Sequence, residues 1–304
     1  MSRIYLALLS TLVTSLCLAP PAGARDAADS PQVIDDRQIR MRFERELGKL
    51  KDEGKAPEPK DLQKQLGERK KHALDLSKIG GLKRSDGTPS VYAMRKSSVL
   101  CFGHIYKCDK CTKWHGNLAG GFVLTPDGIA VTNYHVMESD KAGAFGAMTA
   151  DGKVHLVEEV LAGSKANDIA IVRLAGDGFD PAPIRADEPV GARVSAISHP
   201  QGRFYTFSEG IVSRYYKQRG KNGESERMAI TADFAKGSSG SPIFSADGTV
   251  VGMVSSTNSI YYDRDSKGVE TNLQMVIKSC IPSRSILKLL SQTETDSGDQ
   301  QASR

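Results

Sequence analysis

Short runs of apolar and β-branched residues, separated by turn sequences, dominate the chain from about Val91 onward. Residues 121–132 and 241–254 each place an Asp-Gly turn between two such runs. Asp-Gly accepts the positive φ that closing a hairpin requires, so both stretches predict β-hairpins. Further runs of this kind cover residues 154–160, 169–174, 193–198 and 210–216. Many short strands at this spacing are typical of an all-β sandwich or barrel.

Residues 33–76 follow a different pattern, in which charges are dense and apolar residues recur at helical spacing. The apolar positions are Ile39, Phe43 and Leu47, then Leu62 and Leu66. Gly54–Pro59 interrupts the pattern, which predicts two helices. Because the apolar stripe is narrow, the helices either pack on another surface or are only partly stable alone. A solvated, charged spacer is at least as good an interpretation of the segment as a regulatory role.

The remaining segments predict linkers and ends. Gly80-Gly81 and residues 85–89 are typical of a linker, so residues 25–97 form a basic, partly helical extension. Residues 283–290 have the pattern of a closing helix, and residues 291–304 are polar and predict a flexible tail.

The first 24 residues have the pattern of a signal peptide. Arg3 supplies a positive start, Ile4 to Leu18 is apolar, and Ala22-Gly23-Ala24 fits a cleavage site. A retained membrane anchor is the alternative, but about 15 apolar residues are short for crossing a bilayer. We therefore expect an exported protein, periplasmic or extracellular, with no membrane span once the signal is removed.

The net charge of +5 is unevenly distributed. Residues 25–97 hold 18 Lys and Arg against 13 Asp and Glu, whereas residues 98–304 hold 22 against 23. The basic character thus belongs to the N-terminal extension. Because the rest is nearly neutral, the composition gives no reason to expect nucleic acid as a partner.

Three short motifs suggest catalytic chemistry when taken together. Val131–Val136 ends a predicted strand with His135, Asn167–Leu174 begins one with Asp168, and Gly237–Pro242 surrounds Ser239 with glycine and serine. Each motif alone is weak, since a strand end, a cap and a loop explain them equally well. Their joint occurrence in the order His, Asp, Ser, 33 and then 71 residues apart, favours a catalytic triad.

The chemistry of acyl transfer accounts for these residue types. A serine hydroxyl needs a neighbouring base, and a histidine can accept its proton and later return it. A carboxylate holds the imidazole in the required tautomer. We therefore predict His135, Asp168 and Ser239 as the catalytic residues, with the backbone N–H groups of Gly237 and Ser239 as the oxyanion hole.

At these motifs the sequence resembles the trypsin-like peptidases, and most closely their HtrA-type bacterial branch. The matching stretches are Gly120–Phe122, Thr132–Val136, Asn167–Ala170, His199–Gly202, Ser208–Ser213 and Gly237–Pro242. The resemblance spans residues 98–290 and implies two six-stranded antiparallel barrels of chymotrypsin type, about 98–182 and 188–282. It also implies a serine endopeptidase that acts on proteins or peptides without a cofactor.

The sequence departs from the family in two respects. HtrA-type proteins usually carry a PDZ domain after the protease, and only a predicted helix and tail follow residue 282 here. Digestive trypsin-like enzymes have an aspartate before the nucleophile that pairs with a new N-terminus. Ser238 stands at that position, so activation by such an ion pair is not expected.

The resemblance also implies a pocket for the side chain before the scissile bond. Its wall corresponds to Val254, Ser255, Ser256 and Thr257, and its floor to Asp233. An acidic floor favours Arg or Lys in the substrate. The alternative is that Asp233 caps a turn, or that differing loop lengths place another residue at the floor.

Four cysteines remain after removal of the signal: Cys101, Cys108, Cys111 and Cys280. An even number in an exported protein favours disulfides. Cys108 and Cys111, flanked by His104 and His115, also have spacing that suits tetrahedral zinc. The compartment favours disulfides, and the sequence assigns no metal to catalysis.

A second class of function remains open at this point. The same fold can serve as a pseudoprotease or holdase that grips peptides without cutting them. The presence of all three triad residues and the oxyanion glycine favours the enzyme. The composition and motifs do not indicate the natural substrate or the oligomeric state.

Overall fold

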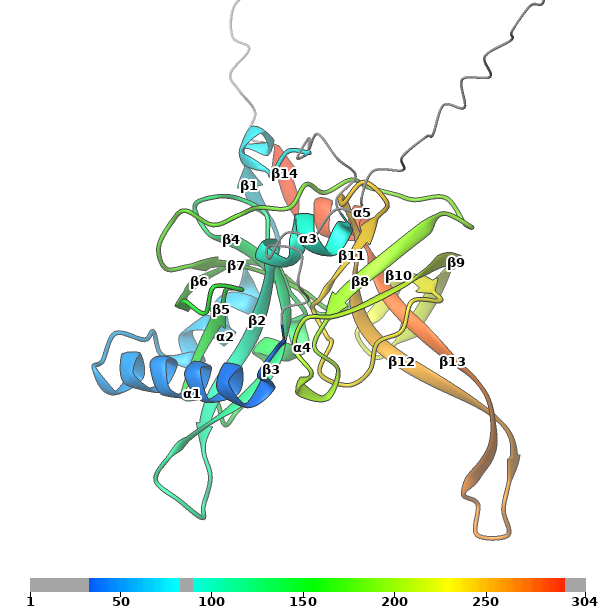
Figure 1. Cartoon of the computed structure of the whole chain (residues 1–304), viewed down its shortest axis with the longest axis horizontal. Coiled ribbons are helices and arrows are strands. Elements are labelled where there is room, and N and C mark those ends of the chain that lie inside the picture. Colours follow the sequence, from blue (N-terminus) through cyan, green and yellow to red (C-terminus); the bar gives the residue numbers. More distant parts are fainter. Residues whose placement is uncertain (1–32, 83–89, 293–304) are drawn as a thin grey trace, which may run out of the picture. The chain divides into compact units, whose positions relative to one another are not determined.

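Figure 1 shows the computed structural model, which describes residues 33–82 and 90–292. The predicted signal peptide, the predicted linker stretch 85–89 and residues 293–304 lie outside the described residues. Strands dominate what is described, and they form two closed six-stranded antiparallel barrels. The prediction of an all-β fold with two barrels of chymotrypsin type is confirmed.

The first barrel, called barrel 1 below, has the strand order β2-β3-β4-β7-β6-β5. Its strands are β2 (Val99–Lys107), β3 (Trp114–Val123), β4 (Ile129–Thr132), β5 (Ala144–Met148), β6 (Val154–Ser164) and β7 (Ile169–Leu174). Alternate residues point inward and form one core that includes Phe102, Phe145, Val160 and Val172. A short helix, α4 (Tyr134–Met137), follows β4 directly.

The second barrel, barrel 2, has the strand order β10-β13-β12-β11-β8-β9. Its strands are β8 (Arg193–Ser198), β9 (Thr206–Gly220), β10 (Gly223–Ile230), β11 (Pro242–Ser245), β12 (Val250–Arg264) and β13 (Glu270–Pro282). The short helix η4 (Pro200–Gly202) joins β8 to β9, and the core includes Val212, Ile243 and Val254.

Both predicted hairpins are confirmed. In the first, Leu124 N donates to Ile129 O over 2.8 Å and Gly128 has φ +85°, the positive value that the turn requires. In the second, Ser245 N donates to Thr249 O over 2.9 Å. Similar turn sequences therefore close a hairpin in each barrel.

The N-terminal extension forms helices that pack on barrel 1. Helix α1 spans Asp36–Asp52, with the Asp35 side chain accepting from Gln38 N, and α2 spans Pro59–Glu68 with proline in its first turn. Their apolar stripes are buried at Phe43, Leu47, Leu62 and Leu66. Full burial of each such side chain stabilises the fold by about 1.5–3 kcal/mol. Of the two interpretations of this segment, packing on a surface is correct.

The last part of the extension and the chain after barrel 2 contain short elements that patterning missed. These are β1 (His72–Leu74), η2 (Leu76–Lys78), α3 (Val91–Arg95), η3 (Lys96–Ser98) and β14 (Leu290–Gln292). The predicted closing helix corresponds to α5 (Ser283–Leu287), which is shorter than predicted. Residues 291–292, predicted as tail, instead pair in parallel with β1. This pairing depends on tertiary proximity, which the local sequence does not encode.

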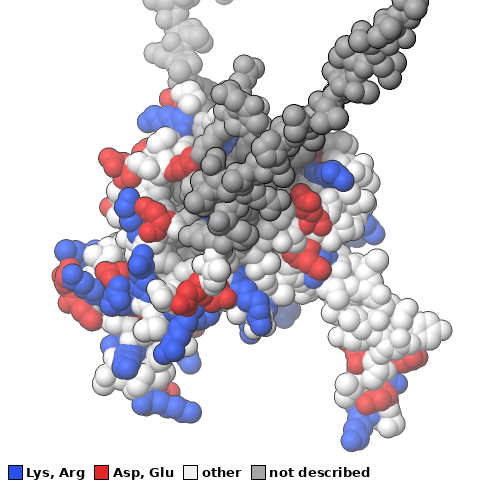
Figure 2. All heavy atoms as spheres, viewed as in Figure 1, with Lys and Arg blue, Asp and Glu red and all other residues white. Residues whose placement is uncertain are grey.

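Two hairpins extend beyond the barrels, β2–β3 from barrel 1 and β12–β13 from barrel 2 (Figure 1). Figure 2 shows Lys and Arg side chains near the tip of the β2–β3 hairpin, whereas much of the β12–β13 hairpin is uncharged. The exposed apolar residues on β12 and β13 include Tyr262, Leu273 and Met275. The two hairpins therefore present different chemistry to solvent.

Candidate active site

His135 lies on α4, immediately beyond the end of β4. Thr132 ends β4, Asn133 caps the helix with extended backbone, and His135 is its second residue. The Thr132 hydroxyl donates to Gly120 O over 2.8 Å, which joins the end of β4 to β3. The imidazole is therefore held next to the cleft by a short, well-anchored segment.

Asp168 occupies the turn before β7 in a left-handed conformation, with φ +62°. Asn133 Nδ2 donates to its backbone carbonyl over 3.0 Å. Its Oδ1 accepts from the ring nitrogen Nδ1 of His135 over 2.9 Å and from His135 N over 3.1 Å. Its Oδ2 accepts from Ser255 Oγ over 3.1 Å. The carboxylate thus orients the ring and leaves Nε2 directed away from it.

Asp168 also sets the protonation behaviour of His135. Burial alone lowers the pKa of His135, but the hydrogen bond from its ring to Asp168 and the negative charge of that carboxylate outweigh burial. The net result is a pKa above the ordinary value of a histidine. A histidine in this state is a stronger base toward a serine hydroxyl.

Ser239 lies in the loop between β10 and β11, between two glycines with left-handed backbone. Gly237 has φ +96° and Gly240 has φ +83°, values that disfavour any residue with a side chain. Gly120 N donates to Ser239 O over 2.7 Å, which fixes the loop against β3. Among the described residues, the N–H groups of Gly237 and Ser239 donate to no protein acceptor. They fit the predicted oxyanion hole.

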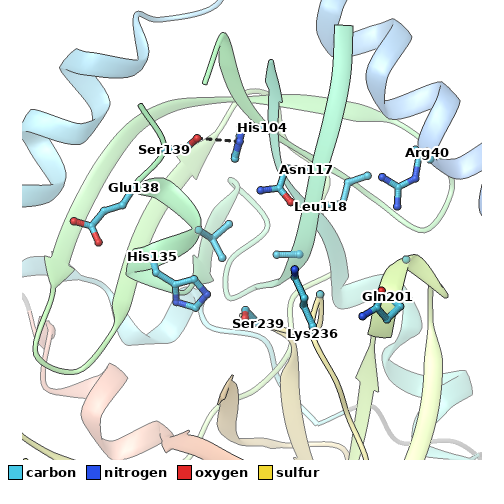
Figure 3. A pocket seen from close by; sticks show the side chains of 14 residues that line it. Arg40, His104, Asn117, Leu118, His135, Glu138, Ser139, Gln201, Lys236 and Ser239 are labelled. Carbon is cyan, nitrogen blue, oxygen red and sulfur yellow. Dashed lines mark hydrogen bonds between the residues drawn. The ribbon is translucent and has the colours of Figure 1, made fainter. Parts of the chain in front are cut away.

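The Ser239 hydroxyl makes a long hydrogen bond, 3.5 Å, to Ser255 O. Within the described part of the chain, the hydroxyl makes no hydrogen bond to His135. Both side chains nevertheless line one cleft of about 420 Å³. Figure 3 draws His135 and Ser239 among the side chains that line this cleft. The structure therefore brings all three predicted triad residues to one place, with the Ser239 hydroxyl bonded to Ser255 O rather than to His135.

The same cleft contains cationic residues that the sequence motifs did not indicate. Arg40 reaches it from α1, and Lys236 lies at its edge beside Gly237 (Figure 3). Arg40 also donates to Gly116 O over 3.2 Å. Arg40 belongs to the extension, about 200 residues from Ser239 in the chain, so no local signal connects the two.

Two other histidines near the site are buried, and burial lowers the pKa of both His104 and His199 to about 4. His104 contacts Ser139 Oγ at 3.1 Å and lines the cleft. Nδ1 of His199 accepts from Tyr205 N, so Nε2 carries the proton and donates to Leu100 O over 3.1 Å. His199 therefore links the two barrels as a neutral side chain.

The predicted substrate-pocket residues are only partly close to the site. Val254 is buried and its carbonyl accepts from Gly240 N, while Ser255 contacts Asp168. The side chain of Ser256, the next residue on β12, is exposed. The side chain of Asp233 is 86 % exposed and lies 3.0 Å from Lys278 Nζ. The acidic floor stays a prediction, and the nearby ammonium group offsets its charge.

The four cysteines that the structure describes are all free thiols, so the disulfide prediction is not met. Cys101 lies in barrel 1 and Cys280 in barrel 2, each buried among apolar residues. Burial raises the pKa of Cys101 to about 12 and raises the pKa of Cys280 as well. The prediction failed because an even number of cysteines does not show which thiols lie close enough to form a bond.

The fold is of chymotrypsin type, with two antiparallel six-stranded barrels. A histidine–aspartate pair lies on one barrel and a glycine-flanked serine on the other. Residues 119–253 match the trypsin-like peptidase domain family. Over this range the chain is similar to trypsin-like peptidases, and the curated relatives that it matches include DegP-like serine endoproteases.

The curated relatives match over part of their length. The magnetosome formation protease MamE of Magnetospirillum gryphiswaldense is 30 % identical over 142 residues, which are 45 % of this chain and 18 % of MamE. A probable periplasmic serine endoprotease, DegP-like, of Marinomonas is 28 % identical over 182 residues, 59 % of this chain and 36 % of that protein. The chain thus spans about a fifth to a third of these relatives.

A solved structure of the HtrA-type protease AlgW with a tripeptide has a similar fold. It superposes with a TM-score of 0.52 at 19 % identity and covers 66 % of this chain and 62 % of its own. At this identity the likeness concerns the fold alone.

Proposed function

We propose that this chain is an exported serine endopeptidase that cleaves peptide bonds through an acyl-enzyme, with His135, Asp168 and Ser239 as its triad. The observation that carries the proposal is the pairing of His135 Nδ1 with Asp168 at 2.9 Å, in a cleft that Ser239 also lines. This arrangement leaves Nε2 of His135 as the free nitrogen for the serine proton.

In the proposed reaction, Ser239 Oγ attacks the scissile carbonyl carbon while His135 Nε2 takes the hydroxyl proton. The carbonyl oxygen becomes an oxyanion that accepts hydrogen bonds from the N–H groups of Gly237 and Ser239. The C–N bond then breaks, and the leaving amine takes the proton from His135. A water molecule repeats the sequence and releases the acid. The Ser239 hydroxyl must first leave Ser255 O, a contact that is weak at 3.5 Å.

Export is supported by the pattern of residues 1–24 and by DegP-like relatives whose names describe them as periplasmic. In the described ranges 33–82 and 90–292, no helix is both long enough and apolar enough to cross a bilayer.

The cleft also supports a substrate preference. Arg40 and Lys236 place two positive charges at its edge, and the acidic lining residue Glu138 is paired with Lys165 over 2.6 Å. We propose that the substrate residue occupying this part of the cleft is preferably Asp or Glu, because a charge-assisted hydrogen bond to Arg is then available.

Labelling with a fluorophosphonate, followed by mass spectrometry, tests the catalytic assignment. Ser239 should be labelled, and Ser239→Ala should lose both label and peptidase activity, by about 10⁶-fold in turnover if the triad acts as a unit. Ser238→Ala removes the neighbouring hydroxyl and should retain both. A folded wild-type chain that neither reacts nor cleaves would instead support the pseudoprotease or holdase function.

A peptide library tests the substrate preference. Arg40→Gln with Lys236→Gln should reduce cleavage of peptides with Asp or Glu at one position by about tenfold, since an exposed charge pair contributes up to about 1 kcal/mol each. Arg37→Gln, an exposed arginine on the same helix outside the cleft, should leave the profile unchanged. A profile that does not change in the double variant would contradict the preference.

A further inference from the structure

The tip of the β2–β3 hairpin gathers three side chains that the proposed peptidase chemistry does not use. Cys108 and Cys111 lie in the loop after β2, and His115 is the second residue of β3. Cys108 Sγ and Cys111 Sγ are 3.4 Å apart, and His115 Nε2 lies 3.2 Å from the first and 3.0 Å from the second. The three atoms form a nearly equilateral triangle.

This triangle has nearly the dimensions of a zinc-ligand set. With Zn–S of about 2.3 Å and Zn–N of about 2.0–2.1 Å, tetrahedral geometry gives S···S of about 3.8 Å and S···N of about 3.5 Å. The observed separations are within about half an ångström of these values. A small opening of the loop is enough to admit the ion.

Metal binds cysteine as the thiolate, which positive charge nearby favours. Lys107 and Lys113 add positive charge to the same loop. Two thiolates and a neutral imidazole together carry a charge of −2, which balances the charge of a bound divalent ion.

We propose that Cys108, Cys111 and His115 bind one Zn²⁺ in tetrahedral geometry at the tip of the β2–β3 hairpin, with the fourth position open to water or an external ligand. Sulfur and imidazole ligands in a tetrahedral set select zinc over magnesium or calcium, which prefer oxygen. A disulfide between the two cysteines would use only two of the three converging groups.

The site connects to the rest of barrel 1 through Trp114. Its Nε1 donates to Asp52 Oδ1 at the end of α1 over 3.1 Å, and its ring lies 4.2 Å from Lys107 Nζ. Strand β3 continues from His115 to residues 117–119, which line the cleft. We therefore expect zinc to stabilise the hairpin and the docking of α1, and to affect cleavage less than thermal stability.

Metal analysis of the purified full-length mature chain tests the proposal. The wild type, prepared with reductant and supplied with zinc, should retain one Zn²⁺ per chain after desalting. Cys108→Ser, Cys111→Ser and His115→Gln should each lose most of it. Cys280→Ala and His155→Gln, a buried cysteine of barrel 2 and a histidine of barrel 1 outside the cluster, should keep it. A chelator should lower the melting temperature of the wild type but not that of Cys108→Ser.

Cobalt provides a measurement that does not depend on the variants folding. Titration of the wild type with Co²⁺ should give thiolate-to-cobalt charge-transfer absorption that saturates at one equivalent and disappears when zinc is added. Absence of this absorption would overturn the proposal. So would zinc that remains in all three ligand variants, or a Cys108–Cys111 disulfide that persists in reductant and leaves no metal bound.

Discussion

The two barrels contribute to the candidate active site in different ways. Barrel 1 carries His135 and Asp168, which are joined by hydrogen bonds to both the ring and the backbone of the histidine. Barrel 2 carries Ser239, whose hydroxyl has, among the residues that the structure describes, only the 3.5 Å contact to Ser255 O. The base and its carboxylate are therefore organised within one barrel, whereas the nucleophile depends on how the second barrel is placed.

The contacts between the barrels are few and polar where they concern the site. Gly120 N donates to Ser239 O over 2.7 Å, and Ser255 Oγ donates to Asp168 Oδ2 over 3.1 Å. A Cβ at Gly120 would lie 2.1 Å from Ser241 Oγ, so only glycine allows the two backbones to approach this closely. Assembly of the triad therefore depends on the packing of the two barrels as much as on local sequence.

Asp168→Asn should have the largest effect on the pair in barrel 1. The amide presents an N–H to His135 Nδ1 and favours the wrong tautomer, so kcat should fall by about 10⁴-fold with the fold intact. Peptide cleavage by the purified variant measures this. Asp140→Asn, an exposed carboxylate five residues after His135, is the matched control and should retain activity.

The pH profile of the same variant tests how Asp168 affects the protonation of His135. Cleavage needs neutral His135, so in the wild type kcat/KM should fall as pH drops through a value above the ordinary histidine pKa of 6.5. Asp168→Asn removes the hydrogen bond and the charge that raise the pKa of His135, while burial still lowers it. The acid limb of the residual activity should therefore move to lower pH. An unchanged acid limb would mean that Asp168 does not set the pKa of His135.

Ser255→Ala tests the contact between the barrels, with an intermediate effect. It removes a hydrogen bond to a charged carboxylate, worth about 1.5–3 kcal/mol, so kcat/KM should fall by about 10- to 100-fold. Asp168 then has one donor fewer and attracts the His135 proton more strongly, which should move the acid limb to higher pH, opposite to Asp168→Asn. Ser259→Ala, an exposed serine further along β12, is the control. Loss of activity without this shift would indicate a structural role only.

Much of the fold was predictable because its signals are local. Short apolar runs and Asp-Gly turns identify strands and hairpins, and the observed strands of the two barrels lie within 99–174 and 193–282. The positions of His135 and Ser239 were predictable because a strand end and a glycine-flanked loop dictate them. The left-handed backbone at Gly237 and Gly240 explains why glycine stands at these two positions.

The remaining features depend on tertiary contacts that no local pattern contains. Arg40 reaches the cleft only because α1 packs on barrel 1, and β14 exists only because β1 lies beside it. The cysteine prediction failed for the same reason, since pairing depends on which thiols meet in space. A count of cysteines cannot show that Cys101 and Cys280 are buried in separate barrels.

Asp233→Ser should have the smallest effect of these changes. Its carboxylate is exposed and lies 3.0 Å from Lys278 Nζ, which also donates to Phe234 O over 2.7 Å. An exposed ion pair is worth about 1 kcal/mol or less, so discrimination between Arg and a small apolar residue before the scissile bond should change by less than about fivefold. Cleavage of a matched pair of peptides measures that ratio. Lys278→Met, which removes the neighbouring ammonium group, should uncover any attraction of Asp233 for a basic substrate as a gain in cleavage after Arg. A drop of a hundredfold or more in Arg selectivity on replacing Asp233 would establish it as the acidic floor of the pocket, and would mean that Lys278 moves aside when substrate binds.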